Sequence, residues 1–92
     1  MYILTVKGRE TDGAYSVINA DGEQILYLFV QEDDAIRYAL LLEEDEYPEM
    51  HVIELEDEAV LTMCEIENYK YTIITPNDIV IPPKDNDYFS ED

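Results

Sequence analysis

The sequence predicts an α+β domain, with a mostly antiparallel sheet of about five strands and two helices packed on one face of that sheet. Short runs rich in β-branched and aromatic residues alternate with glycine-containing breaks, which is typical of strands and turns. Two other segments change their apolar pattern from alternation to helical spacing. Their order along the chain, β-β-β-α-β-α-β, favours a single sheet with its helices in one layer.

Three strands are predicted in the first 30 residues. The runs at 2–6 (YILTV) and 14–18 (AYSVI) are separated by a glycine-containing break. Asp21-Gly22 tolerates the positive φ of a tight turn, so the second strand is expected to form a hairpin with a third at 24–30 (QILYLFV). Because this third strand is apolar on both faces, we expect it in the middle of the sheet.

The two helices are predicted at 31–46 (QEDDAIRYALLLEEDE) and 56–68 (EDEAVLTMCEIEN). In the first, Ile36, Ala39 and Leu40 are expected to share the apolar face, with Ala35 and Leu42 flanking it. Both helices begin with acids, which interact favourably with the positive end of the helix dipole. The first helix also ends on acids, where such charge is unfavourable.

The rest of the domain follows these helices. Strands are predicted at 50–55 (MHVIEL) and 69–75 (YKYTIIT), and residues 79–81 could add a short edge strand before two prolines end it. A single domain is therefore expected over residues 1–83. Residues 84–92 (KDNDYFSED) are expected to be a flexible acidic tail, because they have no apolar periodicity.

Composition narrows the class of protein. The chain has 92 residues, with 23 Asp and Glu against five Lys and Arg and a net charge of −18. Such charge disfavours direct binding to nucleic acid or anionic lipid, whereas eight Tyr and two Phe argue against general disorder. No run approaches the roughly 20 apolar residues of a membrane span, and the first residues do not resemble a signal peptide. The single Cys64 is compatible with a reducing compartment. A cytoplasmic protein is expected.

Three motifs carry a resemblance to a known family. They are ETDGAYSV at 10–17, FVQEDDAIRYALLLEEDEYP at 29–48 and IVIPP at 79–83. On these residues the chain resembles the domain-of-unknown-function family number 3110, found in cyanobacteria and plant plastids. Members typically carry a TDNEG loop before IY, an EDDA-RYALLLE-QDFP helix and a C-terminal PP. The residues that match the helix motif are Glu32, Asp33, Asp34, Ala35, Arg37, Tyr38, Ala39, Leu40, Leu41, Leu42, Glu43 and Pro48.

The resemblance spans most of residues 2–83. It implies a photosynthetic host, with the plastid stroma as the compartment if the source is a plant, and it implies no activity, cofactor or catalytic residue. The chain departs from the family at EEDEYPE (43–49), which is more acidic than the family's AQDFP.

The sequence offers little for catalysis. Cys64 with His51 is the one conceivable pair of thiol and base, but Cys64 lies in the middle of a predicted helix among acids, which is the wrong setting for a thiolate. One Cys and one His cannot complete a zinc site, and the tail lacks the glycine of a calcium loop. We expect no enzyme activity, no metal and no cofactor.

The acids between residues 43 and 67 number eleven, and no Lys or Arg lies among them. We expect them to form one continuous surface that runs from the first helix through the loop to the second. They are either a solvated surface or a docking surface for a basic protein partner, with aromatic residues as apolar anchors. The candidate partner-binding residues are Glu43, Glu44, Asp45, Glu46, Tyr47, Glu49, Glu56, Asp57, Glu58, Tyr88 and Phe89.

Three alternatives to a general docking module remain open. The first is a DNA mimic, because a domain of this size matches roughly the charge of a duplex that carries one negative charge per ~1.7 Å. The second is a small accessory subunit of a larger assembly, in keeping with a photosynthetic host. The third is a homodimer, because a sheet with both helices on one face would leave the other face open.

Overall fold

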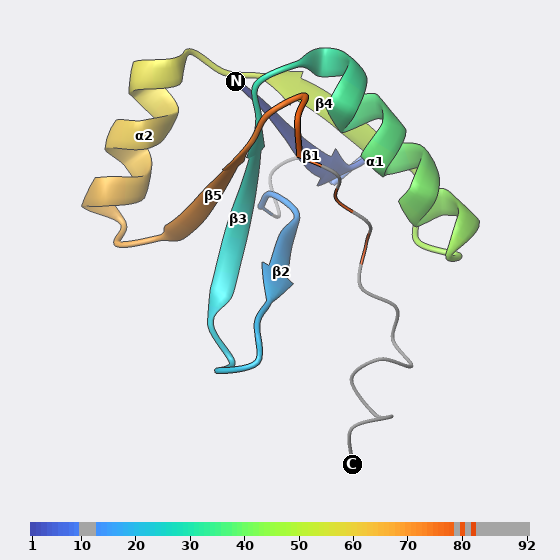
Figure 1. Ribbon diagram of the computed structural model, residues 1–92, viewed down its shortest axis with the longest axis horizontal. Coiled ribbons are helices and arrows are strands. Elements are labelled where there is room, and N and C mark those ends of the chain that lie inside the picture. The colour runs from blue at the N-terminus through green and yellow to red at the C-terminus, as the bar shows by residue number, and fades with distance from the viewer. Residues whose placement is uncertain (10–12, 79, 81, 83–92) are drawn as a thin grey trace.

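The computed structural model describes residues 1–9, 13–78, 80 and 82. Each strand and helix predicted between residues 2 and 75 is confirmed, with ends that differ by two residues at most. The elements are β1 (Tyr2–Val6), β2 (Ser16–Ile18), β3 (Gln24–Phe29), α1 (Glu32–Glu44), β4 (Met50–Glu54), α2 (Asp57–Ile66) and β5 (Lys70–Ile74) (Figure 1). The proposed strand at 79–81, the domain end at 83 and the tail at 84–92 lie outside the described residues or only partly within them.

The strands form one open sheet that is mostly antiparallel, as predicted. Its order is β2-β3-β1-β4, and β5 pairs with β3 in addition. The pairs β2–β3, β1–β3 and β1–β4 are antiparallel, whereas β3–β5 is parallel. Strands β3, β4 and β5 therefore run in one direction and β1 and β2 in the other.

Strand β3 is the centre of this sheet. One of its edges is shared by β2, which pairs at residues 24–26, and by β1, which meets it at Phe29. Its other edge pairs with β5 along residues 25–29. The hairpin predicted at Asp21-Gly22 is confirmed, and Gly22 adopts a φ of 82°.

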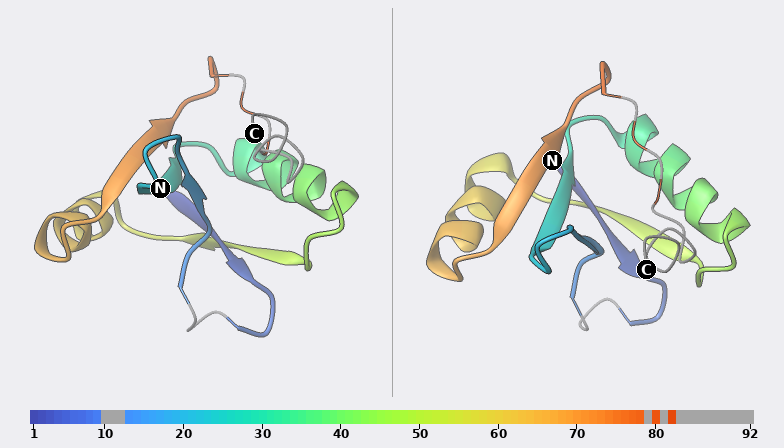
Figure 2. Two further views of the ribbon diagram at one scale, coloured as in Figure 1. Left: turned by 90° about the horizontal axis from the view of Figure 1, so that it is seen from below. Right: turned by 60° about the horizontal axis from the view of Figure 1, so that its bottom comes forward.

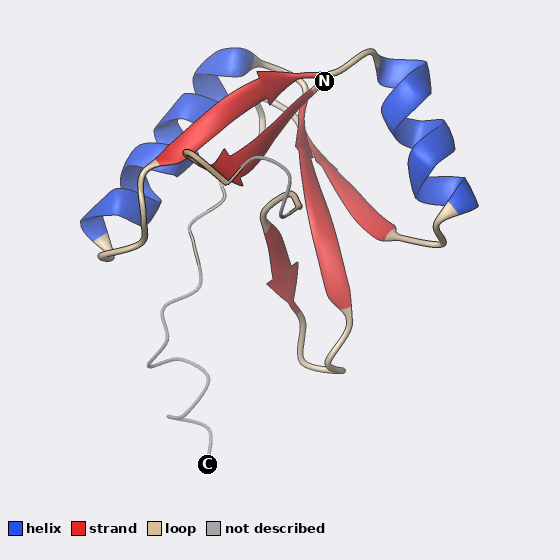
Figure 3. Ribbon diagram, turned by 180° about the vertical axis from the view of Figure 1, so that it is seen from behind, coloured by secondary structure: helices blue, strands red, loops and turns tan. Residues whose placement is uncertain are grey.

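The two helices lie on opposite faces of the sheet, and the prediction that both cover one face is wrong (Figures 2 and 3). Val60 and Cys64 of α2 pack against Leu28. Tyr38 of α1 packs against Phe29, the next residue along β3. Leu28 and Phe29 are both 0% exposed, so each face of β3 has its own cover.

The order of the strands explains this arrangement. Helix α1 connects β3 to β4 past β1, and α2 returns from β4 to β5 in the opposite direction. Connections between parallel strands share one hand, so two connections that run in opposite directions must lie on opposite faces. The sequence pattern alone did not reveal that β3, β4 and β5 are parallel.

The buried face of α1 agrees with the prediction only in part. Ala35, Tyr38, Ala39 and Leu42 are buried, whereas Ile36 and Leu40 are exposed. Tyr38 is buried because its ring packs edgewise on Tyr15 and Tyr27 and tilts against Phe29. Its hydroxyl lies 3.0 Å from the hydroxyl of Tyr15, which gives the phenol a hydrogen-bond partner in the core.

Replacing either Leu28 or Phe29 by alanine tests the two-sided sheet. We expect Leu28→Ala to lower the free energy of unfolding by about 2–5 kcal/mol and Phe29→Ala by about 3–5 kcal/mol, because each removes a fully buried side chain. Urea unfolding followed by far-UV circular dichroism measures both.

Val30→Ala is the matched control, because Val30 is 39% exposed. It should cost less than about 1 kcal/mol. A cost below that value for Leu28→Ala or Phe29→Ala would mean that one face of β3 is not covered.

Candidate functional site

Residues 43–49, here called the acidic turn, join the end of α1 to β4. Glu43 and Glu44 are the last residues of the helix, and Asp45 and Glu46 follow directly. All four are exposed, and the last turn of α1 contains no basic residue. None of the four forms an ion pair with another residue that the structure describes, whereas Glu49 binds Lys7, with Oε2 3.1 Å from Nζ.

The turn itself is fixed by backbone hydrogen bonds that close the end of the helix. The N–H of Tyr47 donates to the carbonyl of Leu42 (3.0 Å), and the N–H of Glu46 donates to that of Glu43 (3.1 Å). This is a Schellman motif, in which glycine usually occupies the left-handed position. Glu46 holds that position with a φ of 70°, and such a conformation costs a residue with a side chain about 1–2 kcal/mol.

Helix α2 ends in the same motif with a more favourable residue. The N–H of Tyr69 donates to the carbonyl of Cys64 (2.8 Å), and Asn68 holds the left-handed position with a φ of 58°. Asparagine tolerates this conformation better than other residues with a side chain. The strain at Glu46 is therefore not a general requirement of this fold.

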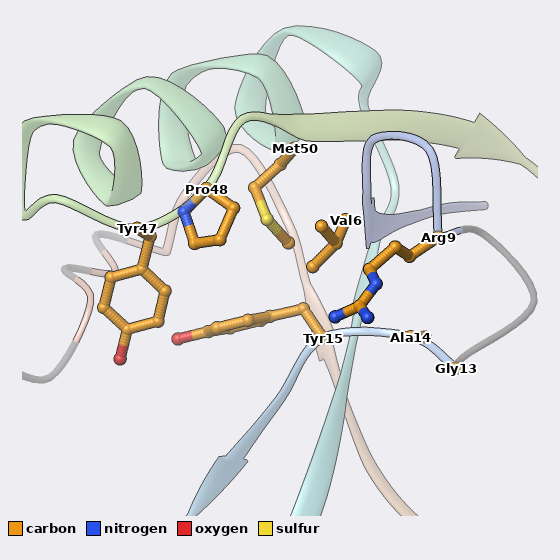
Figure 4. A pocket seen from close by; sticks show the side chains of 8 residues that line it. All are labelled: Val6, Arg9, Gly13, Ala14, Tyr15, Tyr47, Pro48 and Met50. Atoms are coloured by element: carbon orange, nitrogen blue, oxygen red, sulfur yellow. The ribbon is translucent and has the colours of Figure 1, made fainter.

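A pocket of about 320 Å³ lies beside the acidic turn (Figure 4). Pro48 and Met50 lie next to one another on one side, Tyr15 lies across from them, and Tyr47 and Val6 lie toward the two ends. Arg9 also lines the pocket and brings a guanidinium to a lining that is mostly apolar. The pocket could receive an apolar or aromatic side chain, with tyrosine hydroxyls and one guanidinium for polar contacts.

No pattern in the sequence pointed to Arg9 and Tyr15 as pocket residues. Both lie far along the chain from Tyr47 and Pro48. They approach the turn because Val6 pairs with Met50 and because the N–H of Tyr15 donates to the carbonyl of Leu4 (2.6 Å). Only the register of these strands brings them to the pocket.

An exposed apolar pair precedes the acidic turn on α1. Ile36 is 42% exposed and Leu40 is 57% exposed, although both belong to the helix that covers one face of the sheet. Leu40 lies three and four residues before Glu43 and Glu44, and such spacings place side chains side by side on a helix. The outer face of α1 therefore combines apolar and acidic groups.

The second group of candidate acids, Glu56, Asp57 and Glu58, does not join the first. It lies at the start of α2, beyond the far end of β4, whose five residues span about 17 Å. Helix α2 also covers the opposite face of the sheet. Asp57 pairs with the ammonium of Met1 (2.6 Å), and the remaining candidates, Tyr88 and Phe89, lie outside the described residues.

The expected continuous acidic surface from the first helix to the second is therefore divided in two. The pattern of acids along the chain suggested continuity because only six residues separate Glu49 from Glu56. Strand β4 lies between them in the sequence and is extended, so the acidic turn and the acids at the start of α2 lie at its opposite ends.

The conceivable thiol and base pair does not assemble. Cys64 is 1% exposed in the core below α2, and burial raises the pKa of its thiol above the ordinary 9.0. His51 is exposed on β4. Within residues 1–9, 13–78, 80 and 82, no three His, Cys, Asp or Glu side chains are grouped to hold a metal ion, and no helix is long and apolar enough to cross a membrane.

The expected homodimer rested on a sheet face that neither helix covers, and the structure has no such face at β3. Leu26 and Leu28, which would have lined that face, are 8% and 0% exposed because α2 covers them within the same chain. A pocket of about 540 Å³ remains on this face, beside α2 and lined by Ile3, Leu26, Ile53 and Met63.

Comparison with known proteins identifies one family. A family model described as "Domain of unknown function (DUF3110)" matches residues 1–84, which include the acidic turn and all seven elements. No curated protein and no solved structure matches the chain. The family resemblance read from the helix motif is thereby confirmed.

Substitution of Glu46 by glycine tests the strain in the acidic turn. Glu46→Gly should raise the free energy of unfolding by about 1 kcal/mol, because glycine adopts a positive φ without a steric cost. Asn68→Gly, at the equivalent position of α2, should change it by only a few tenths of a kcal/mol. Equal effects of the two substitutions in urea unfolding would show that Glu46 is not strained.

The buried Cys64 thiol and Tyr38 phenol predict a loss of stability in alkali. Burial raises both pKa values above the ordinary 9.0 and 10.0, so the unfolded chain releases these protons at lower pH than the folded one. The contribution of these two protonated groups to the free energy of unfolding is fully present below pH 9.0. It falls as pH rises, by up to about 1.4 kcal/mol per pH unit for each group.

The Tyr38→Phe variant isolates one of these two groups. Its free energy of unfolding, measured in urea from pH 8 to about 11, should fall less steeply above pH 10.0 than that of the parent. Parallel curves for parent and variant would exclude a contribution from Tyr38.

Proposed function

The chain belongs to the family described as a domain of unknown function (DUF3110), and we propose that it is a non-enzymatic docking module that binds a basic protein through the acidic turn. One observation carries the proposal. Glu43, Glu44, Asp45 and Glu46 are exposed at the negative end of α1, and none of them forms an ion pair with another described residue. Opposite charge on a partner would compensate these acids.

The energetics of the acidic turn support this reading over a surface that only keeps the protein soluble. Each exposed acid at the negative end of a helix is unfavourable by about 0.3–1 kcal/mol, and the left-handed Glu46 adds about 1–2 kcal/mol. Acids at other exposed positions would provide the same solubility without these costs. A small domain is stable by only about 5–15 kcal/mol, so the combined cost is a substantial fraction.

Apolar groups beside the acids indicate the chemistry of the partner. Binding energy concentrates on buried apolar and aromatic anchors, whereas charges at the rim set the rate and specificity of association. Ile36 and Leu40 lie exposed on α1, and Tyr47 and Pro48 line the pocket beside the turn. A basic segment that carries apolar side chains fits this combination.

A DNA mimic is less well supported than a docking module. Mimicry requires charges in two rows along one side of the protein, with the spacing of phosphates. The acidic turn and the acids at the start of α2 lie at opposite ends of β4 and over opposite faces of the sheet.

The basic partner could equally be a neighbouring subunit, which would make this chain an accessory subunit of a larger assembly. Such a module would act in the cytoplasm, or in the stroma of a plastid if the source is a plant.

A defined basic peptide tests the proposal. The probe is a fluorescent Lys- and Leu-containing amphipathic helix, and its binding to the parent should weaken as salt is added because exposed charges are screened. A fourfold variant with Glu43, Glu44 and Glu46 changed to Gln and Asp45 to Asn should bind at least about tenfold more weakly. Backbone amide shifts in the parent should concentrate at residues 36–50.

The matched control is Glu56, Glu58, Glu65 and Glu67 changed to Gln, which removes the same charge from α2. It should bind the peptide within about threefold of the parent, because general attraction between exposed charges is weak. Equal losses in the two variants, with shifts spread over the whole surface, would refute a docking site at the acidic turn.

A further inference from the structure

Strand β5 is an edge of the sheet with an unusual surface for this protein. It pairs with β3 and with no other strand that the structure describes. Tyr71 and Ile73 are 40% and 39% exposed, and the nearby Ile66 and Tyr69 are 76% and 55% exposed. The chain from residue 69 to 77 (YKYTIITPN) contains no Asp or Glu and includes Lys70.

The backbone of β5 also presents unpaired groups at this edge. The carbonyl of Ile74 accepts from the N–H of Val30 (3.0 Å), so the backbone of Ile74 points toward β3. Successive residues of a strand direct their N–H and C=O groups to alternate sides. Thr72 therefore also points toward β3, whereas Tyr71 and Ile73 direct their N–H and C=O groups outward.

The other edges of the sheet are protected against strand pairing in ways that β5 is not. Edge strands are usually kept apart by charge or by short length. Strand β4 follows Glu49 directly and ends with Glu54, and β2 is only three residues long. Strand β5 has five residues, and its one charge is Lys70, which pairs with Glu23.

We propose that β5 is a self-association edge, at which a second copy of this chain adds its own β5 in antiparallel pairing. Two chains of net charge −18 repel one another, so they can approach only where acids are absent, and β5 is such an edge. A two-fold axis near Thr72 places Tyr71 of each copy opposite Ile73 of the other. The outward N–H and C=O groups then bond to each other, and the exposed apolar side chains beside them are covered.

The charges that flank β5 determine how this association responds to salt. Glu67 precedes the acid-free stretch, and Asp78 follows it, where its carboxylate accepts from the N–H of Thr75 (2.8 Å). About the same two-fold axis, Glu67 of one copy approaches Asp78 of the other. Salt screens this repulsion together with that between the net charges, so self-association strengthens with salt, whereas docking of a basic partner weakens.

Sedimentation equilibrium of the full chain, over a concentration series at low and high salt, tests the proposal. The parent should form a dimer whose association constant rises at least about tenfold from low to high salt. Tyr71→Glu should weaken the dimer at least about tenfold, because like charges enter the pairing edge. His51→Glu adds the same charge to the exposed β4 edge and should change the constant by less than about threefold.

Amide hydrogen exchange of the parent gives a second readout that does not depend on how the variants fold. The amides of Tyr71 and Ile73 should exchange more slowly as protein concentration rises, while that of Thr72 stays equally protected. A monomer at every concentration and salt, or a dimer that His51→Glu disrupts and Tyr71→Glu does not, would overturn the proposal. So would exchange at Tyr71 and Ile73 that is independent of concentration. None of these outcomes bears on the acidic turn, which lies on a different surface.

Discussion

The fold depends on covering both faces of β3. Leu26 and Leu28 point to one side of this strand and Tyr27 and Phe29 to the other, and its backbone pairs on both edges. One helix cannot cover two faces, so α1 and α2 must lie on opposite sides. That requirement agrees with the parallel directions of β3, β4 and β5, which send the two connections past the sheet in opposite directions. It also makes β5 an edge, because α2 delivers the chain to the outer side of β3.

Acidic side chains in this protein are distributed unevenly. They gather at the acidic turn and are absent from strand β5. Both helices start with acids that favour their dipoles, and both end without basic residues. At the end of α1 the acids continue through a left-handed Glu46, beside a pocket lined by Tyr47 and Pro48. Strand β5 is the opposite case, because it contains no acid and exposes Tyr71 and Ile73. We propose a partner of opposite charge for the first surface and a copy of the same chain for the second.

Local patterns in the sequence predicted the elements, but not their arrangement in space. Apolar alternation and helical spacing identified the strands and helices, and Asp21-Gly22 identified the hairpin. Helical spacing did not predict that Tyr38 is buried. Its ring fills the core and its hydroxyl lies within hydrogen-bond distance of the Tyr15 hydroxyl, whereas Ile36 and Leu40 lie at the surface. Local patterns also failed for the extent of the acidic surface and for the pocket, since strand direction and register are properties of distant residues. Arg9 and Tyr47 line the same pocket only because β1 pairs with β4.

The central claim is that the acidic turn keeps destabilising charge because a basic partner binds there. The most direct measurement is the free energy of unfolding of the parent and of the variant neutralised at residues 43–46, each with and without the basic peptide. A ligand that binds only the folded state stabilises it by an amount set by its concentration and affinity. We expect the variant to be more stable than the parent when each is alone, and the peptide to stabilise the parent but not the variant. Equal stabilisation of both by the peptide, or a variant that is less stable alone, would contradict it.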